Sequence, residues 1–153
     1  MQRIIIAVIL ILAMSWDGFA DEKTHNASVS HKRNVCNYIK KGVDSLLYEN
    51  SHLHGATTTC SYTEDRLLIK SNSKLNEERM SWFVFLAFSM VGSLRNDDFM
   101  LPDKVYVGCK SVCQVLSTND AAELQHSAKN DGDSGMRNAR LRAFNAKKVS
   151  CPK

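Results

Sequence analysis

The spacing of hydrophobic and polar residues changes along this chain, and one uncharged run, Met80–Leu94, is longer than a typical strand. Charged residues stand at 77–79 before it, and Arg95 follows it directly. A helix that crosses a bilayer needs about 20 mostly apolar residues, whereas strands usually run about 4–8 residues. The run therefore predicts a helix buried in a protein core, with a strand as the alternative.

The flanking residues predict where this helix begins and ends. Asn76 is a good N-cap, and Glu77 and Glu78 would place carboxylates at the positive end of the helix dipole. Arg95 would lie in the last turn, where a cation is favoured. We therefore predict a central helix over about 76–95.

At about 100° per residue, this helix has two unlike faces. We expect the sheet to cover a wide apolar arc: Met80, Phe83, Val84, Ala87, Phe88, Met90, Val91 and Leu94. The opposite face mixes small and aromatic side chains, which are binding-face candidates: Ser81, Trp82, Phe85, Ser89 and Gly92. Because helices that are apolar all round are usually buried, this second face is either ordinary core or the contact for a second layer, a partner chain or a ligand.

Two pairs of segments with alternating or strand-forming residues flank the central helix. Residues 56–62 and 67–70 predict one β-hairpin, and residues 104–109 and 112–116 predict another. In the first strand, alternate residues face one way, so we expect it to be half-buried.

Helical patterns precede the first hairpin and follow the second. Val35, Ile39 and Val43 would share one face of an amphipathic helix over 34–50, and 121–129 predicts a short helix. This order of elements predicts a small single-domain α+β fold, with antiparallel β-hairpins packed on the central helix and flanking helices. A parallel arrangement of strands across the central helix is the alternative.

The two ends of the chain differ from the middle in composition. Arg3, an apolar segment over 4–14 and the small-x-small pattern of Gly18-Phe19-Ala20 predict a cleaved signal peptide over 1–20. Export to the periplasm or the extracellular space follows, with no transmembrane helix in the mature chain. We divide the remainder into a flexible N-terminal arm, a globular α+β domain, and a Gly/Asp linker with a basic tail, over 21–33, 34–129 and 130–153.

The chain has five cysteines, and export would place them in an oxidising compartment where disulfides are favoured. The candidates are Cys36, Cys60, Cys109, Cys113 and Cys151. Cys36 and Cys60 both lie on apolar faces, so Cys36–Cys60 is the favoured pair. A three-residue turn would bring Cys109 opposite Cys113, a two-residue turn would offset them, and Cys151 could bridge to either. An odd number leaves one thiol free within a single chain.

No nucleophile-elbow, zincin or phosphate-loop motif is present. His52 and His54 are the most metal-like pair, because an extended segment would place both imidazoles on one side. A metal site needs three or four ligands, and His25, His31 and His126 are candidates only if the fold brings them close. We therefore predict no cofactor and no catalytic residue; an exported metal-dependent or hydrolytic enzyme using His52 and His54 is the alternative.

The formal net charge is +4, and the C-terminal tail is basic without an acidic residue. Its candidates for contact with an anionic surface are Arg137, Arg140, Arg142, Lys147 and Lys148. Phe144 is the only aromatic residue of the tail, Met136–Lys153, which does not favour nucleic acid. We predict an exported, disulfide-containing binding or accessory protein whose partner is another protein, with an anionic envelope surface as a further alternative.

Overall fold

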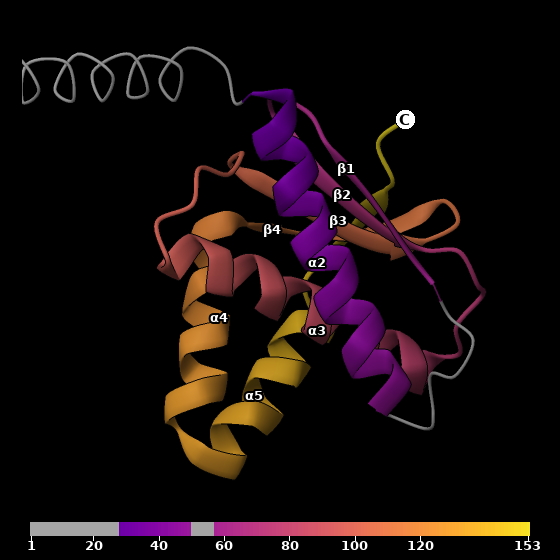
Figure 1. Ribbon diagram of the computed structural model, residues 1–153. Coiled ribbons are helices and arrows are strands. Elements are labelled where there is room, and N and C mark those ends of the chain that lie inside the picture. Colours follow the sequence, from indigo (N-terminus) through magenta and orange to yellow (C-terminus); the bar gives the residue numbers. More distant parts are fainter. Residues whose placement is uncertain (1–27, 50–56) are drawn as a thin grey trace, which may run out of the picture.

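The computed structural model describes residues 28–49 and 57–153, and only the backbone of 46–49. The signal peptide predicted over 1–20 and the pair His52 and His54 lie outside the described residues. The described chain holds four helices and a five-stranded sheet, which confirms the α+β class (Figure 1). The elements are α2 (Val29–Glu49), β1 (Thr58–Tyr62), β2 (Arg66–Ser71), α3 (Glu77–Asn96), β3 (Lys104–Cys109), β4 (Val112–Ser117), α4 (Thr118–Asn130), α5 (Gly132–Phe144) and β5 (Lys147–Ser150).

The strands are arranged in the order β1-β2-β3-β4-β5. The two predicted hairpins are present as β1–β2 and β3–β4, and β5 adds antiparallel to β4. The hairpins join through parallel pairing of β2 with β3, with Leu67 opposite Val105 and Ile69 opposite Val107. The sheet is therefore mixed rather than wholly antiparallel. The reason is α3, which carries the chain back along the sheet between the hairpins, as a parallel pair requires.

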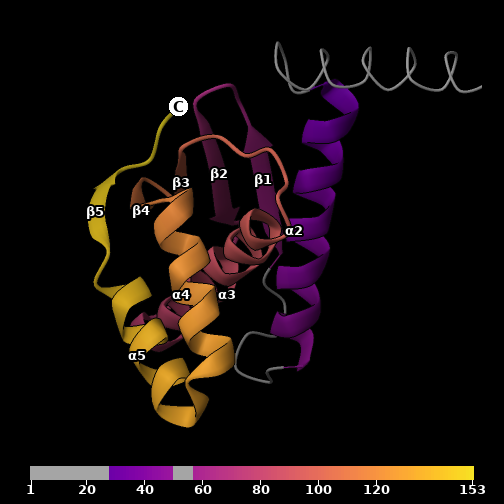
Figure 2. The ribbon, with the colours of Figure 1, turned by 90° about the vertical axis from the view of Figure 1, so that its left-hand side faces the viewer.

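The helices lie against one face of the sheet (Figures 1 and 2). The strand residues on this face that belong to the core are fully buried: Leu67, Ile69, Val105 and Val107. They share a single hydrophobic cluster with Phe83, Phe88 and Val91 of α3. Each such side chain stabilises the fold by about 1.5–3 kcal/mol relative to exposure, so the apolar cluster between α3 and the sheet contributes substantially to stability.

The ends of α3 are as predicted from the sequence. The Asn76 side-chain oxygen accepts a hydrogen bond from the backbone N–H of Arg79 at 2.9 Å, which caps the helix. Glu77 and Glu78 lie in the first turn, and Arg95 lies in the last. Local capping chemistry therefore fixes both ends of the central helix.

The second face of α3 is covered by α4 and α5. A Cβ atom on Gly92 would lie 2.1 Å from the carbonyl oxygen of Ala121, so α4 packs directly on the glycine backbone. Phe85 is only 5% exposed, and the Ser89 hydroxyl is buried. Trp82, near the start of α3, is half-buried under Arg140 of α5, whose guanidinium lies 4.4 Å from the ring centre. The part of this face formed by Trp82, Phe85, Ser89 and Gly92 is therefore covered within the protein itself, and Ser81 remains partly exposed.

Helix α2 begins earlier than the sequence analysis predicts. It starts at Val29, and the Ser28 hydroxyl accepts a hydrogen bond from the N–H of His31 at 3.1 Å, which is an N-cap contact. Residues 29–33 are therefore helical and not part of a flexible arm. His31 also bonds the carbonyl oxygen of Met100 at 2.8 Å and so ties the first turn to the segment before β3.

The segment described above as a linker and basic tail is structured over 132–150, as α5 and β5. Gly132, at φ +68°, makes the turn between α4 and α5. Helix α5 buries three small residues spaced four apart, Gly135, Ala139 and Ala143. A Cβ on Gly135 would lie 2.5 Å from the Ser127 carbonyl oxygen, so the two helices approach closely. Small side chains give little hydrophobic signal, which is why the pattern did not predict a packed helix.

Candidate functional site

Two disulfides cross-link the described chain, and they lie on opposite sides of the sheet. Cys36–Cys60, the pair favoured from the sequence, joins α2 to β1 on the helix-covered side. Cys113–Cys151 joins β4 to the residue that follows β5. Two structural disulfides indicate a small protein that folds in an oxidising compartment.

The Cys109–Cys113 pairing is not formed, because the β3–β4 turn contains only Lys110 and Ser111. This turn sets Cys109 opposite Val112 and Cys113 opposite Gly108, so the two sulfurs lie on different faces of the sheet. Cys109 keeps a free thiol, which lies 3.0 Å from the Ser73 carbonyl oxygen. Gly108 makes room for the second disulfide, since a Cβ there would lie 2.8 Å from the Cys113 sulfur.

The face of the sheet that none of the described helices covers is the candidate functional site, and we call it the open face. Directly paired residues share a face of a sheet, and the register places Leu68, Tyr106, Val115 and Lys147 in one row across β2 to β5. The next rows add Lys70 and Val149 on one side, and Arg66 and Lys104 on the other. We define the open face by these eight residues.

Apolar side chains form the centre of the open face. Leu68, Tyr106, Val115 and Val149 are half-buried, and none of them belongs to the hydrophobic core cluster. They therefore contribute little to the packing between the sheet and the helices. An apolar cluster that lies outside the core and is partly accessible to solvent is a candidate interaction site.

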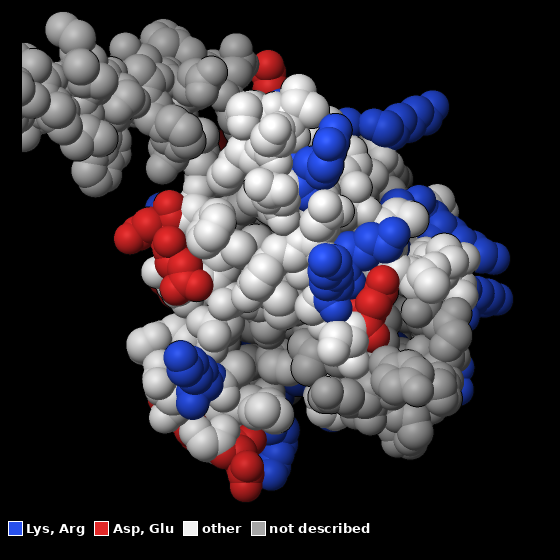
Figure 3. Space-filling model, in the orientation of Figure 1, with Lys and Arg blue, Asp and Glu red and all other residues white. Residues whose placement is uncertain are grey.

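Basic side chains surround this apolar centre. The strands carry Arg66, Lys70, Lys104, Lys147 and Lys148, and no Asp or Glu occurs in any of the five. All but Lys148 are on the open face, while Lys148 lies on the other face, 5.3 Å from the Phe144 ring centre. Lys104 and Lys147 are exposed. By contrast, both signs of charge occur in the helices, and Figure 3 shows basic and acidic side chains on the side where α2 lies.

The last residues of the sequence lie over part of the open face. Cys151 is bonded to Cys113 on β4, and its N–H donates to the Ser111 carbonyl oxygen at 2.8 Å. The Arg66 guanidinium of β2 donates to the Lys153 carbonyl oxygen at 2.7 Å. The segment after β5 is thus held to two strands and narrows the accessible part of the face.

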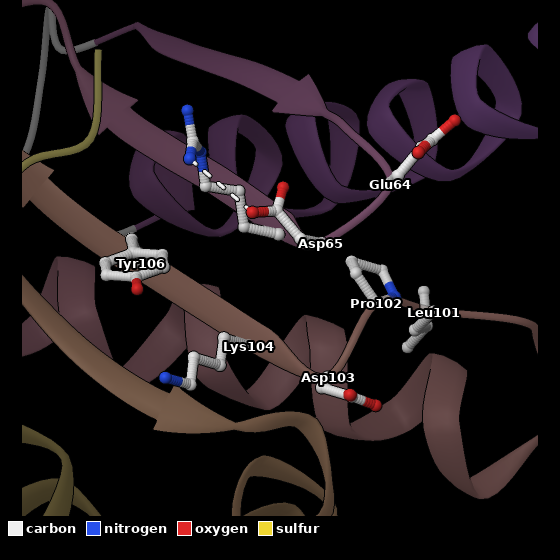
Figure 4. A pocket seen from close by; sticks show the side chains of 8 residues that line it. Glu64, Asp65, Leu101, Pro102, Asp103, Lys104 and Tyr106 are labelled. Carbon is white, nitrogen blue, oxygen red and sulfur yellow. Dashed lines mark ion pairs between the residues drawn. The ribbon is translucent and has the colours of Figure 1, made fainter.

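A hollow of about 390 Å³ lies at one end of the open face (Figure 4). Lys104 and Tyr106 of β3 line it together with the turn before β2, where Arg66 forms an ion pair with Asp65 at 3.8 Å. Glu64 and Asp103 add further carboxylates at its rim. This end of the face is therefore of mixed charge, unlike the remainder.

A second hollow, of about 610 Å³, lies between the start of α3 and α5. Two glutamates and two arginines line it together with Ser81 and two apolar side chains: Glu77, Glu78, Arg137, Arg140, Leu141 and Phe144. Because the two acids face two bases, this groove offers no net charge to a ligand.

The basic residues predicted as one anionic-surface site do not form a single patch. Arg140 stacks on Trp82, and Arg142 pairs with Asp120 at 3.9 Å and with Glu123 at 3.5 Å. Arg137 lines the α3–α5 groove, while Lys147 and Lys148 point to opposite faces of the sheet. Only Lys147 belongs to the open face.

On the helix-covered side of the sheet, a polar cluster fixes α2 to the segment before β3. The Tyr62 hydroxyl donates to the Met100 carbonyl oxygen at 3.1 Å, and the same oxygen contacts His31 Nε2 at 2.8 Å. Burial raises the pKa of Tyr62 above its usual value, because a phenolate would lose solvation there. The His31 and Phe99 rings are stacked with centres 6.5 Å apart. His31 thus has a structural environment of aromatic and carbonyl groups.

Within residues 28–49 and 57–153, no group of three or more metal-ligating side chains is placed to hold a metal ion. None of the helices in the same part of the chain is both long and apolar enough to cross a membrane. Comparison of the chain with models of known families, with curated proteins and with solved structures gave no match. The case for function therefore depends on the geometry of the open face.

Proposed function

We propose that this protein is an exported binding or accessory protein that uses the open face of its sheet to bind another protein. The observation that carries the proposal is the second apolar cluster, centred on Leu68 and Tyr106, which lies outside the core and is ringed by basic side chains. Protein interfaces commonly place apolar and aromatic residues at the centre and polar residues at the rim. Tyr and Arg are also enriched among the residues that dominate binding energy.

The disulfides support export as part of this proposal. Two bridges, Cys36–Cys60 and Cys113–Cys151, are stable in oxidising compartments and rare in the cytosol. The proposed signal peptide would end at Ala20, so the exported chain would start at Asp21. Intact mass of the protein recovered from the extracytoplasmic fraction, before and after reduction, checks both statements. A chain that still begins at Met1, or that gains no mass on reduction, contradicts them.

Site-specific photocross-linking tests the docking face. The photoreactive residue p-benzoylphenylalanine replaces Tyr106 on the open face, Asn138 on the exposed side of α5, or Arg137 in the α3–α5 groove. We expect a discrete protein adduct from position 106 in the native extracytoplasmic fraction, and none from 138. An adduct from 137 but not 106 would move the site to α5. Equal adducts from all three positions would indicate non-specific contact, and either result would overturn the proposal.

A further inference from the structure

We infer that the partner protein presents an acidic surface, with carboxylates placed around an apolar patch. This inference rests on the proposed function, because it specifies the partner of the same open face. The charge distribution carries it: the strands contain five basic residues and no acidic one, and four of the five lie on the open face. Complementary charge at an interface raises the association rate and selects the partner.

The register gives the spacing of these positive charges. Arg66 and Lys104 are opposite each other on β2 and β3, so about 5 Å separates their positions. Lys70 is four residues from Arg66 along β2, about 13 Å away, and Lys147 is two strands from Tyr106, about 10 Å away. The charges therefore surround an apolar area that a small cluster of partner side chains can cover.

Three of the four cations are available for such contacts. Arg66 already pairs with Asp65 and donates to the Lys153 carbonyl oxygen. Lys70, Lys104 and Lys147 take part in none of the ion pairs among the described residues. Carboxylates of a partner would neutralise them without breaking an internal bond.

A protein fits this face better than nucleic acid or an anionic bilayer does. Glu64, Asp65 and Asp103 at one end of the face would repel a phosphate backbone or a lipid headgroup layer. Tyr106 is the only aromatic residue on the face, whereas single-stranded nucleic acid uses successive aromatic side chains for stacking. A protein surface can instead place a base opposite Asp103 and carboxylates opposite the lysines.

The test uses defined probes at matched charge concentration and over a salt series. They are the synthetic copolymer poly(Glu,Tyr), poly-L-glutamate, single-stranded poly(dT), and vesicles containing phosphatidylglycerol. We expect poly(Glu,Tyr) to bind the full chain most tightly, since it supplies both carboxylates and apolar contacts, and its Kd to rise with salt. Tighter binding of poly(dT) or of vesicles than of both polypeptides would overturn the inference.

Two charge-matched variants locate the binding. Lys70→Glu/Lys104→Glu/Lys147→Glu reverses the open face, and Lys40→Glu/Lys41→Glu/Lys129→Glu reverses exposed lysines on α2 and α4. We expect the first to weaken poly(Glu,Tyr) binding about ten-fold or more and the second to change it less than about three-fold. Equal losses would show that only net charge matters and would overturn the inference. Thermal melts of both variants establish that each is folded.

The outcomes also separate this inference from the proposed function. Suppose that a protein cross-links at position 106 but that its binding changes neither with salt nor with the open-face reversal. The proposed docking face would then stand, and the inference of an acidic partner would be overturned. Absence of any adduct at position 106 overturns the proposed function itself.

Discussion

The two faces of one sheet differ in what their side chains do. On β2, Ile69 is fully buried in the core beneath the helices, whereas Leu68, its neighbour in sequence, points to the open face and lies outside the core. The same contrast separates Val107 from Tyr106 on β3. One face therefore packs on the helices, and the other displays apolar and basic groups that lie outside the core, together with the Cys113–Cys151 disulfide.

This difference shows which residues are available for function. The sheet and helices α2, α4 and α5 all pack on α3. Most of its aromatic and small side chains are therefore buried in contacts within the protein. Within residues 28–49 and 57–153 the open face has no second layer, and the C-terminal segment that crosses part of it is attached by a disulfide and by Arg66. Substitutions on the two faces should therefore have opposite consequences for stability and binding.

The largest expected effect comes from the disulfide on the open face. Cys113→Ala/Cys151→Ala opens a loop with a sequence separation of 38 residues, and the chain-entropy model assigns such a closure about 4 kcal/mol. We expect the free energy of unfolding to fall by about 3–4 kcal/mol in urea titrations under oxidising conditions. A loss below about 1 kcal/mol would mean that the bridge does not stabilise the fold.

The next effect compares neighbouring residues on the two faces. Ile69→Ala removes a core side chain and should lower the free energy of unfolding by about 2–4 kcal/mol. Leu68→Ala should lower it by about 1 kcal/mol or less, because Leu68 is half-buried outside the core. Urea unfolding of both variants measures the difference. Equal losses would mean that the open face is part of the core.

Two glycines sharpen the contrast within the helical layer. Gly92→Ala should lower the free energy of unfolding by about 2 kcal/mol, because the new methyl group meets backbone of α4 at 2.1 Å and this clash exceeds the gain in helix propensity. Gly42→Ala is the matched control. Its methyl would meet the flexible end of Met90, at 2.2 Å, which can move aside. Thermal melts should rank Gly92→Ala below Gly42→Ala; the reverse order would contradict the packing of α3 against α4.

The smallest effect concerns the hydroxyl of Tyr62. Tyr62→Phe removes the hydrogen bond to the Met100 carbonyl oxygen and should lower the free energy of unfolding by about 1 kcal/mol at neutral pH. Burial raises the folded-state pKa of Tyr62 above the unfolded value, so its contribution is complete below about pH 10 and is lost as pH rises through the folded pKa. The urea midpoints of the wild type and of Tyr62→Phe should differ at neutral pH and become similar at about pH 11. A constant gap would contradict the raised pKa.

Local chemistry was sufficient to predict much of the fold. The cap at Asn76, the two hairpins and the apolar stripe of Val35, Ile39 and Val43 follow from short-range patterns, and each is present. For the basic tail, the sequence left a solvated helix and a disordered segment both open. The packing of α5 was not predicted, because its contacts use Gly135, Ala139 and Ala143, which bury little apolar area. Small residues at a spacing of four, after a glycine turn, are the signal that would have found it.

The open face could not be predicted in the same way. Period-two alternation identifies two faces of a strand, but which face is covered depends on where distant helices pack. For the second face of α3, the sequence left core, a second layer, a partner or a ligand open, because the positions of α4 over Gly92 and of α5 over Trp82 depend on packing between distant segments. None of the five strands contains an acidic residue, and this can be seen in the sequence only when the strand boundaries are known.

The most direct test of the division between the two faces is a single substitution measured in two ways. Leu68→Asp, in the chain that carries the photoreactive residue at position 106, places a charge in the apolar centre without entering the core. We predict that the free energy of unfolding from urea titration stays within about 1 kcal/mol of the parent while the protein adduct is lost. An adduct that persists in the folded variant would contradict the account, and so would a loss of stability as large as that of Ile69→Ala.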